Sequence, residues 1–174
     1  MRDFLACAHY LIDKKYTSPA KLAGYGASAG GITLGRAITM EPSLFAAALD
    51  QVGASDLLRK EVGTNGSITA LEYGSTDTKE GFEALLAMSP YNHVVDRTPY
   101  PAVLLTTGIN DSNVPPWQMA KVAARLQAAT SSGKPTLLRI DYQGGHVVGE
   151  TKTETEAMLA DEWSSCRGSS EIRL

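Results

Sequence analysis

Apolar residues along the chain follow two different spacings, and each spacing predicts one kind of element. A spacing of three and four residues, as from Leu5 to Ala8 and Ile12, predicts amphipathic helices. Short, uninterrupted apolar runs between turn residues predict buried strands. The predicted helices cover residues 2–15, 29–40, 117–129 and 150–163, and the predicted strands cover 21–25, 44–49, 101–107 and 136–140.

The alternation of strands with helices of ten or more residues indicates an α/β fold with a parallel sheet. The sequence predicts about four strands, flanked by helices, in one domain over residues 1–166. Between residues 53 and 88 turn residues are frequent, which predicts an excursion over the sheet with one or two short helices, one of them over 81–88. Residues 167–174 show no periodicity and are expected to form a disordered or vector-derived tail.

Composition and charge narrow the class of protein. The 174 residues are enough for one domain with a substantial core. A net charge of -3 without a Lys/Arg cluster argues against nucleic acid or an anionic membrane as a partner. No apolar run reaches the roughly 18 residues that span a bilayer, and no signal-peptide pattern is seen, which favours the cytoplasm. Cys7 and Cys166 are too few for a disulfide framework or a zinc site, and neither a metal nor a cofactor is expected.

The chain contains one G-x-S-x-G motif, which is typical of a nucleophile elbow. Ser28 is its central residue, an apolar run precedes it and a helix-compatible run follows it. Such a strand–turn–helix segment raises a serine hydroxyl above the edge of a parallel sheet. Because the turn is strained, we expect the residues two positions away, Gly26 and Gly30, to be required as small residues. Ser28 is therefore the expected nucleophile.

A histidine and an acid follow the serine in a suitable order. The strand over 101–107 leads to Asp111, and the strand over 136–140 leads to His146, which follows two glycines. Catalytic groups in open α/β sheets gather at the carboxyl ends of the strands. The order Ser28, Asp111, His146 is that of the α/β-hydrolase triad.

The other candidates for base and acid have weaker support. His9 precedes the nucleophile and is expected to be a partly buried helix residue, and His93 is expected in a loop. Asp50 also ends a predicted strand and stays open as an alternative acid. Asp141 lies at a strand end and is expected to pair with the local backbone.

With these residues placed, the chain resembles the catalytic domain of the prolyl oligopeptidase family of serine peptidases, over about residues 3–163. The matching segments are 16–22, 26–31 (GASAGG), 42–47, 51–53, 72–74, 89–92 (SPYN), 107–111 (TGIND) and 145–146 (GH). The resemblance implies that Ser28, Asp111 and His146 form the triad. It also implies that the backbone N–H of Ala29 stabilises the oxyanion.

The chain departs from the family pattern at several points. Ala29 stands where members usually carry Asn, and Asn113 stands where they often carry Arg. The helix before the Ser-Pro motif holds Phe82 and no tryptophan, which argues against proline specificity. The resemblance does not include the family's β-propeller, its first hydrolase strands or the loop with the second oxyanion donor. A sheet edge left open by missing strands predicts a homo-oligomer.

We expect a serine hydrolase that works through an acyl-enzyme. Loss of one oxyanion donor slows the reaction about 100- to 1,000-fold, so short activated esters are favoured over peptides, and a carboxylesterase of peptidase ancestry is expected. Retained oligopeptidase activity, a thioesterase- or lipase-like enzyme and a non-catalytic assembly module stay open as alternatives. The expected substrate-binding residues are Tyr25, Val114 and Val147. Glu72 and Glu83 are candidates to bind a basic substrate group, although surface carboxylates are the simpler interpretation.

Overall fold

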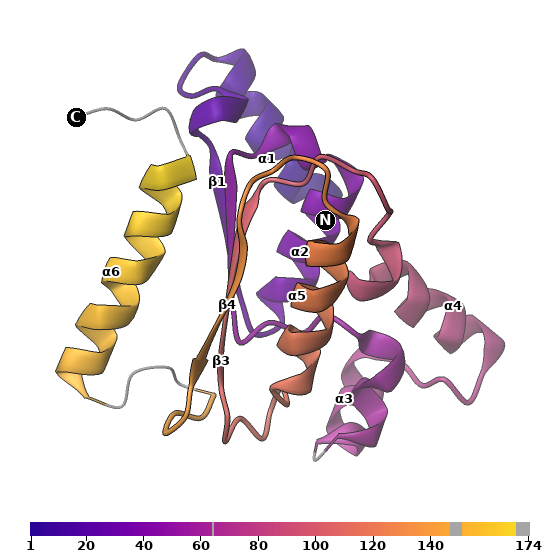
Figure 1. Cartoon of the computed structure of the whole chain (residues 1–174). Helices are drawn as coiled ribbons and strands as arrows, with labels where there is room; N and C mark the ends of the chain where they lie inside the picture. Colours follow the sequence, from indigo (N-terminus) through magenta and orange to yellow (C-terminus); the bar gives the residue numbers. More distant parts are fainter. Residues whose placement is uncertain (64, 147–150, 170–174) are drawn as a thin grey trace.

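The computed structural model describes residues 1–63, 65–146 and 151–169. Its centre is a parallel sheet of four strands in the order β1-β2-β3-β4 (Figure 1). The strands are β1 (Ala23–Ala27), β2 (Ala47–Gln51), β3 (Ala102–Gly108) and β4 (Thr136–Asp141). The helices are α1 (Arg2–Asp13), α2 (Gly30–Met40), α3 (Gly66–Tyr73), α4 (Lys79–Met88), α5 (Trp117–Ala129) and α6 (Lys152–Ser169), and a six-residue 3₁₀ segment, η3, spans Leu57–Val62. The predicted four-stranded parallel α/β sheet is confirmed.

Helices cover the sheet unequally. In Figure 1, α1, α2 and α5 lie on one side of the strands and α6 lies alone on the other. The larger core cluster fills the first side, with Leu34, Val103 and Leu126 among its buried members. Every residue of β3 is buried, as expected for a central strand with helices on both faces. On the second side Met158 of α6 packs against Val52.

The excursion after β2 is folded and has its own small core. It contains α3 and α4, and Leu57 and Leu85 are fully buried there against Ile32 of α2. The short helix expected over 81–88 is present as α4 (Lys79–Met88). The second short helix of the predicted excursion is α3, whose position the sequence did not predict, because its apolar residue Leu71 is 90% exposed and gives no amphipathic pattern.

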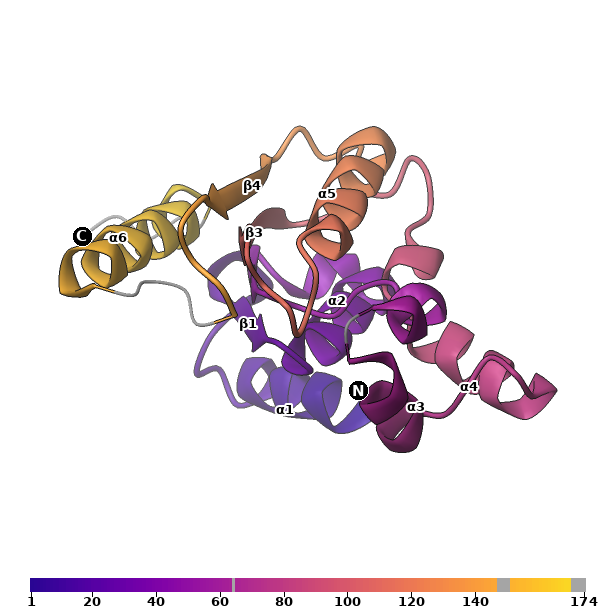
Figure 2. The same ribbon diagram turned by 90° about the horizontal axis from the view of Figure 1, so that it is seen from below.

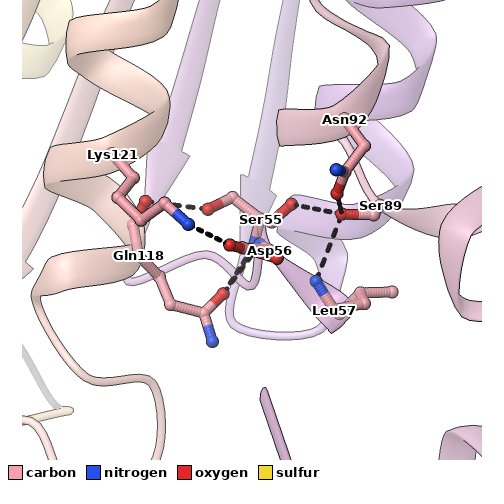
Figure 3. A network of polar contacts seen from close by, with 7 residues as sticks. All are labelled: Ser55, Asp56, Leu57, Ser89, Asn92, Gln118 and Lys121. Carbon is pink, nitrogen blue, oxygen red and sulfur yellow. Dashed lines mark hydrogen bonds and ion pairs between the residues drawn. The ribbon is translucent and has the colours of Figure 1, made fainter. Parts of the chain in front are cut away.

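A polar network holds this excursion against α5 (Figure 3). The side-chain oxygen of Gln118 accepts hydrogen bonds from the backbone N–H groups of Ser55 (2.9 Å) and Asp56 (3.0 Å). Lys121 pairs with the Asp56 carboxylate, and the Ser89 hydroxyl donates to the Ser55 carbonyl (3.1 Å). These bonds tie the turn after β2, the Ser-Pro motif and α5 together, although the Gln118 amide nitrogen is buried without a partner among the described residues.

Several element boundaries differ from the prediction. β1 and β2 begin two and three residues later than expected, at Ala23 and Ala47, because 3₁₀ turns at Pro19–Lys21 and Pro42–Leu44 occupy the preceding residues. Pairing starts where these two strands first face each other, at Ala23 and Ala47. The last helix is longer than predicted and continues through Ser169, three residues into the expected tail. The remainder of that segment, 170–174, lies outside the described residues.

The two edges of the described sheet are β1 and β4. Within the described residues β1 pairs only with β2, so its other edge is open. Assembly of several copies through this edge stays a prediction, and sedimentation of the purified chain tests it. No helix in the described part of the chain combines the length and apolar character needed to cross a membrane.

Candidate active site

Ser28 sits at the tip of a tight turn between β1 and α2. Its backbone has φ of +53°, a left-handed conformation that is strained for a residue with a side chain. The Ser28 N–H donates to the Gln51 carbonyl (2.9 Å), and the Ser28 carbonyl accepts from Gly31 (3.0 Å) and Ala54 (3.0 Å). These bonds hold the strained turn in place.

Close packing beneath the turn explains two of its glycines but not the third. A Cβ on Gly26 would lie 2.6 Å from the Gly30 carbonyl oxygen, and a Cβ on Gly31 would lie 2.6 Å from the Gly53 Cα. A Cβ on Gly30 would meet no heavy atom of the described residues within 4 Å. The expectation that Gly30 is required as a small residue is therefore wrong, and Gly31 has that requirement instead.

The structure brings Ser28, Asp111 and His146 into one hydrogen-bonded line. The His146 Nε2 atom lies 2.9 Å from the Ser28 Oγ, and its Nδ1 lies 2.8 Å from the Asp111 Oδ2. The Asp111 side chain is 0% exposed, and its Oδ1 accepts from the N–H groups of Asn113 (2.9 Å) and Val114 (2.8 Å). An imidazole protonated at Nδ1 donates to Asp111 and leaves Nε2 free to accept the serine proton.

The strand topology explains this convergence. β1, β3 and β4 are parallel, so the segments that follow them meet at one end of the sheet, the end onto which Figure 2 looks. The loop with His146 is fixed against the loop after β3, because Asn110 N–H donates to the Gly144 carbonyl (3.1 Å). Asp141 stabilises the same loop, since its Oδ1 accepts from the N–H groups of Gln143 and Gly144 (both 2.9 Å). These bonds lower the pKa of Asp141, and its predicted pairing with the local backbone is observed.

A pocket of about 220 Å³ opens beside the serine. Its lining residues are Ser28, Ala29, Ala54, Lys60, Asn65, Ile68, Thr69, Glu72, Tyr73, Asn113, Val114 and His146. Val114, an expected substrate-binding residue, and Glu72, a candidate to bind a basic substrate group, thus both line the pocket. Phe82 does not line the pocket. Residues of α3 form part of its wall, and no residue of α4, the helix before the Ser-Pro motif, lines it.

Tyr25, expected to bind substrate, lies elsewhere. Its side chain is 54% exposed, its hydroxyl donates to Gln51 (2.6 Å), and it lines a separate hollow beside Trp163 of α6. The reason is the period of a strand: Gly24 and Gly26 face α2, so Tyr25 points to the opposite side of the sheet. Val147, the remaining expected substrate residue, lies outside the described residues.

The Ala29 N–H has a suitable position for an oxyanion donor. Ala29 follows the nucleophile, is exposed and lines the pocket. Among the described residues, no backbone carbonyl accepts a hydrogen bond from this N–H group. It is therefore available to a ligand in the pocket.

The alternative acid and the other histidines are apart from this site. Asp50 is buried below the turn and makes no hydrogen bond to His146, and burial raises its pKa to about 7. His9 lies in α1 as expected, but its side chain is exposed rather than partly buried and its Nε2 contacts the Glu41 Oε2 (2.7 Å). His93 belongs to a short 3₁₀ turn, where its Nδ1 contacts the Ser89 carbonyl (2.9 Å).

Several pocket residues were not found by sequence reasoning. Lys60, Asn65, Thr69 and Tyr73 belong to η3, α3 and the turn between them, where the sequence has no clear periodicity. Their one signal is their position between a strand end and the Ser-Pro motif. Glu83, the other candidate to bind a basic substrate group, lies outside the pocket, and its Oε1 is 3.9 Å from the Lys79 Nζ. In the described part of the chain, no group of three or more His, Cys, Asp or Glu side chains is arranged to hold a metal ion.

Comparisons with known proteins agree with this geometry. The model of the prolyl oligopeptidase family matches residues 1–164. Prolyl endopeptidase of Dictyostelium discoideum is 35% identical over 162 residues, which is 91% of this chain and 21% of that protein. Prolyl endopeptidase of Elizabethkingia meningoseptica is 38% identical over 160 residues, 91% of this chain and 23% of that protein.

Solved structures show the same likeness. Prolyl oligopeptidase B from Galerina marginata, in its apo form, matches with a TM-score of 0.87 and 31% identity over 99% of this chain and 24% of that one. Oligopeptidase B from Leishmania major matches with a TM-score of 0.85 and 27% identity, again over 99% of this chain and 24% of that one. The chain therefore spans between a fifth and a quarter of these relatives. By its sequence, its sheet and the family model that matches it, the chain belongs to the prolyl oligopeptidase family.

Proposed function

We propose that this chain carries the catalytic centre of a serine peptidase, with Ser28 as nucleophile, His146 as base and Asp111 as the residue that orients the base. The observation that carries the proposal is the hydrogen-bonded line from Asp111 through His146 to Ser28, at 2.8 Å and 2.9 Å. Family membership supports peptide bonds as the substrate class, because the relatives that match are named as endopeptidases and oligopeptidases.

The proposed reaction has two halves. The Ser28 Oγ attacks a peptide carbonyl while His146 Nε2 takes the hydroxyl proton, and the negative carbonyl oxygen is stabilised by the Ala29 N–H. Cleavage of the C–N bond releases the amine, which receives the proton from His146 and leaves an acyl group on Ser28. Water then attacks the acyl carbon as His146 accepts its proton. The acid product leaves and Ser28 regains its hydrogen.

Asp111 contributes by orientation and charge. Its Oδ2 holds the Nδ1–H of His146, and its Oδ1 is fixed by the N–H groups of Asn113 and Val114. The carboxylate is fully buried, so its attraction to the imidazolium that forms during attack is weakly screened by water. Asp111 therefore favours both the correct tautomer and the charged intermediate.

The expected preference for esters has no support in the comparisons, so peptides replace esters as the proposed natural substrates. An activated ester nevertheless reports whether the centre is assembled, because its good leaving group makes acylation easy. A non-catalytic assembly role is the alternative from another class. The formed Ser28–His146 hydrogen bond and the adjacent pocket favour the catalytic proposal over it.

The test measures acylation and peptide cleavage separately. The purified chain and its Ser28→Ala variant are treated with a fluorophosphonate, and mass spectrometry identifies the labelled residue. We expect one adduct, on Ser28, and none in the variant. Hydrolysis of a p-nitrophenyl ester and of a mixed peptide library, followed by mass spectrometry, then shows the turnover. No adduct and equal background hydrolysis in both proteins would refute an assembled centre.

A further inference from the structure

The pocket beside Ser28 contains a cation that the catalytic mechanism does not use. Lys60 belongs to η3 and lines the pocket together with Ser28, Ala29 and His146. Leu57, the first residue of η3, is 0% exposed and packs into the smaller core cluster, which anchors η3. The polar network of Figure 3 fixes the segment just before η3. Lys60 is therefore presented from a rigid support and not from a free loop.

The carboxylates around Lys60 do not neutralise it by direct contact. Within the described residues, no Asp or Glu oxygen lies within 4 Å of the Lys60 Nζ, although Glu72 and Asp111 are near enough to attract it. Asp111 is already engaged by His146 and by two backbone N–H groups. Glu61, which follows Lys60 in the sequence, accepts hydrogen bonds from the backbone N–H and the hydroxyl of Thr76.

Partial burial disfavours the charged form of Lys60. Burial lowers the pKa of Lys60, because its ammonium loses water without gaining a contacting anion. A second donor lies in the same pocket: the Asn113 Oδ1 accepts from the Asn65 amide (2.9 Å), and the Asn113 amide N–H groups donate to no acceptor among the described residues. An ammonium and an amide donor in one partly desolvated pocket suit an anion.

We propose that Lys60 binds a carboxylate of the peptide substrate. This chain then prefers peptides that place an acidic group in the pocket beside Ser28 to peptides that place a neutral group there. The proposal rests on the proposed peptidase function and specifies its substrate class. The carboxylate has two possible sources, an acidic side chain or the free C-terminus of a short peptide. Both present the same chemistry to Lys60.

Glu72 opposes this preference and thereby provides an internal test. It lies on α3, lines the same pocket and is exposed, so its repulsion of a substrate carboxylate is screened by water. Burial, and after it a hydrogen bond with Glu72, raises the pKa of Tyr73 to about 12. We expect removal of the Glu72 charge to strengthen binding of an acidic peptide, and removal of the Lys60 charge to weaken it.

The experiment measures binding in the Ser28→Ala background, where turnover cannot interfere. Four peptides are titrated by calorimetry or NMR: acetyl-Ala-Ala-Glu-amide, its Gln counterpart, acetyl-Ala-Ala-Ala with a free carboxylate, and its amide. We expect the acid of at least one pair to bind about tenfold more tightly than its neutral partner, and the pair that shows this identifies the source of the carboxylate. The preference should disappear with Lys60→Met and increase with Glu72→Gln.

Lys79→Met is the matched control, because Lys79 is an exposed lysine on α4 that does not line the pocket. It should leave the preference unchanged. Thermal unfolding shows whether Lys60→Met is folded, and Lys60→Gln is the second variant if it is not. A preference that survives loss of the Lys60 charge, or tighter binding of the neutral peptides to the starting protein, would overturn the proposal.

A kinetic measurement separates this proposal from the proposed function. The protein with Ser28 intact is labelled by two phosphonate esters that differ only in a Glu or Gln side chain. Faster labelling by the Glu compound, lost in Lys60→Met, supports both proposals. Failure of Ser28 to react with either compound, together with a Lys60-dependent binding preference, would refute the catalytic role and leave the carboxylate site standing.

Discussion

A buried carboxylate below the nucleophile turn should make the stability of this protein depend strongly on pH. Asp50 lies at the end of β2, where Gly26 of β1 and Leu105 of β3 are its partners in the sheet. It is 7% exposed, and its Oδ1 has no hydrogen-bond partner in the described residues. A Cβ on Gly31 would lie 2.7 Å from this oxygen, so the turn is packed directly against it.

The sign and size of the effect follow from the pKa. Burial raises the pKa of Asp50 from 3.8 to about 7, so the folded protein holds this proton more tightly than the unfolded chain does. The free energy of unfolding therefore falls as pH rises from about 4 to about 7 and becomes constant above that. Each pH unit in this window changes it by about 1.4 kcal/mol, which amounts to about 4 kcal/mol over the whole window.

Asp50→Asn keeps the shape and removes the titration. We expect the unfolding free energy of the starting protein to fall by about 2 kcal/mol more than that of the variant between pH 5 and pH 7, because Asp50 is already half ionised in the folded protein at pH 7. The amide leaves a buried donor in the variant, which shifts its curve by a constant and does not change the slope. Urea unfolding followed by circular dichroism at pH 5, 6, 7 and 8 measures the difference.

Asp77→Asn is the control, since Asp77 is an exposed aspartate in the excursion after β2. Its difference from the starting protein should be independent of pH. The histidines are common to all three proteins, so their titration cancels. Parallel curves for the starting protein and Asp50→Asn would refute the reasoning, because they would mean that Asp50 ionises at its ordinary pKa in the folded protein.

Three further substitutions test the site and its support. Gly26→Ala should destabilise the fold by about 2–4 kcal/mol, because its Cβ would meet the backbone of Gly30. Gly30→Ala should change stability by less than about 1 kcal/mol. Comparable urea midpoints for the two variants would contradict this packing. Gln118→Met, which keeps volume but leaves two buried N–H groups without an acceptor, should lose about 2–4 kcal/mol in the same assay, and no loss would show that water replaces the amide. Asp111→Asn should slow fluorophosphonate labelling of Ser28 by about 1,000-fold or more with little loss of fold, and an unchanged labelling rate would exclude Asp111 as the orienting acid.

The excursion after β2 was the segment least predictable from the sequence. The helix α5 was predicted to the residue, because its apolar positions face the main core at helical spacing. The position of α3 was not predicted, because Ile68 and Leu71 are exposed and its sequence has no buried stripe. Yet α3 forms a wall of the pocket, so the part of the chain with the weakest local signal contributes most to the proposed specificity.

The sequence by itself determined the fold class, the family, the nucleophile motif and the order of serine, acid and histidine. These depend on local features: the period of apolar residues, the small residues of a tight turn and the position of polar residues at strand ends. Only the tertiary structure decided that Asp111 and not Asp50 contacts His146, that Tyr25 points away from Ser28, and that Lys60 enters the pocket. Each of these depends on which face of the sheet a side chain occupies and on contacts between residues tens of positions apart, and local sequence patterns do not encode them.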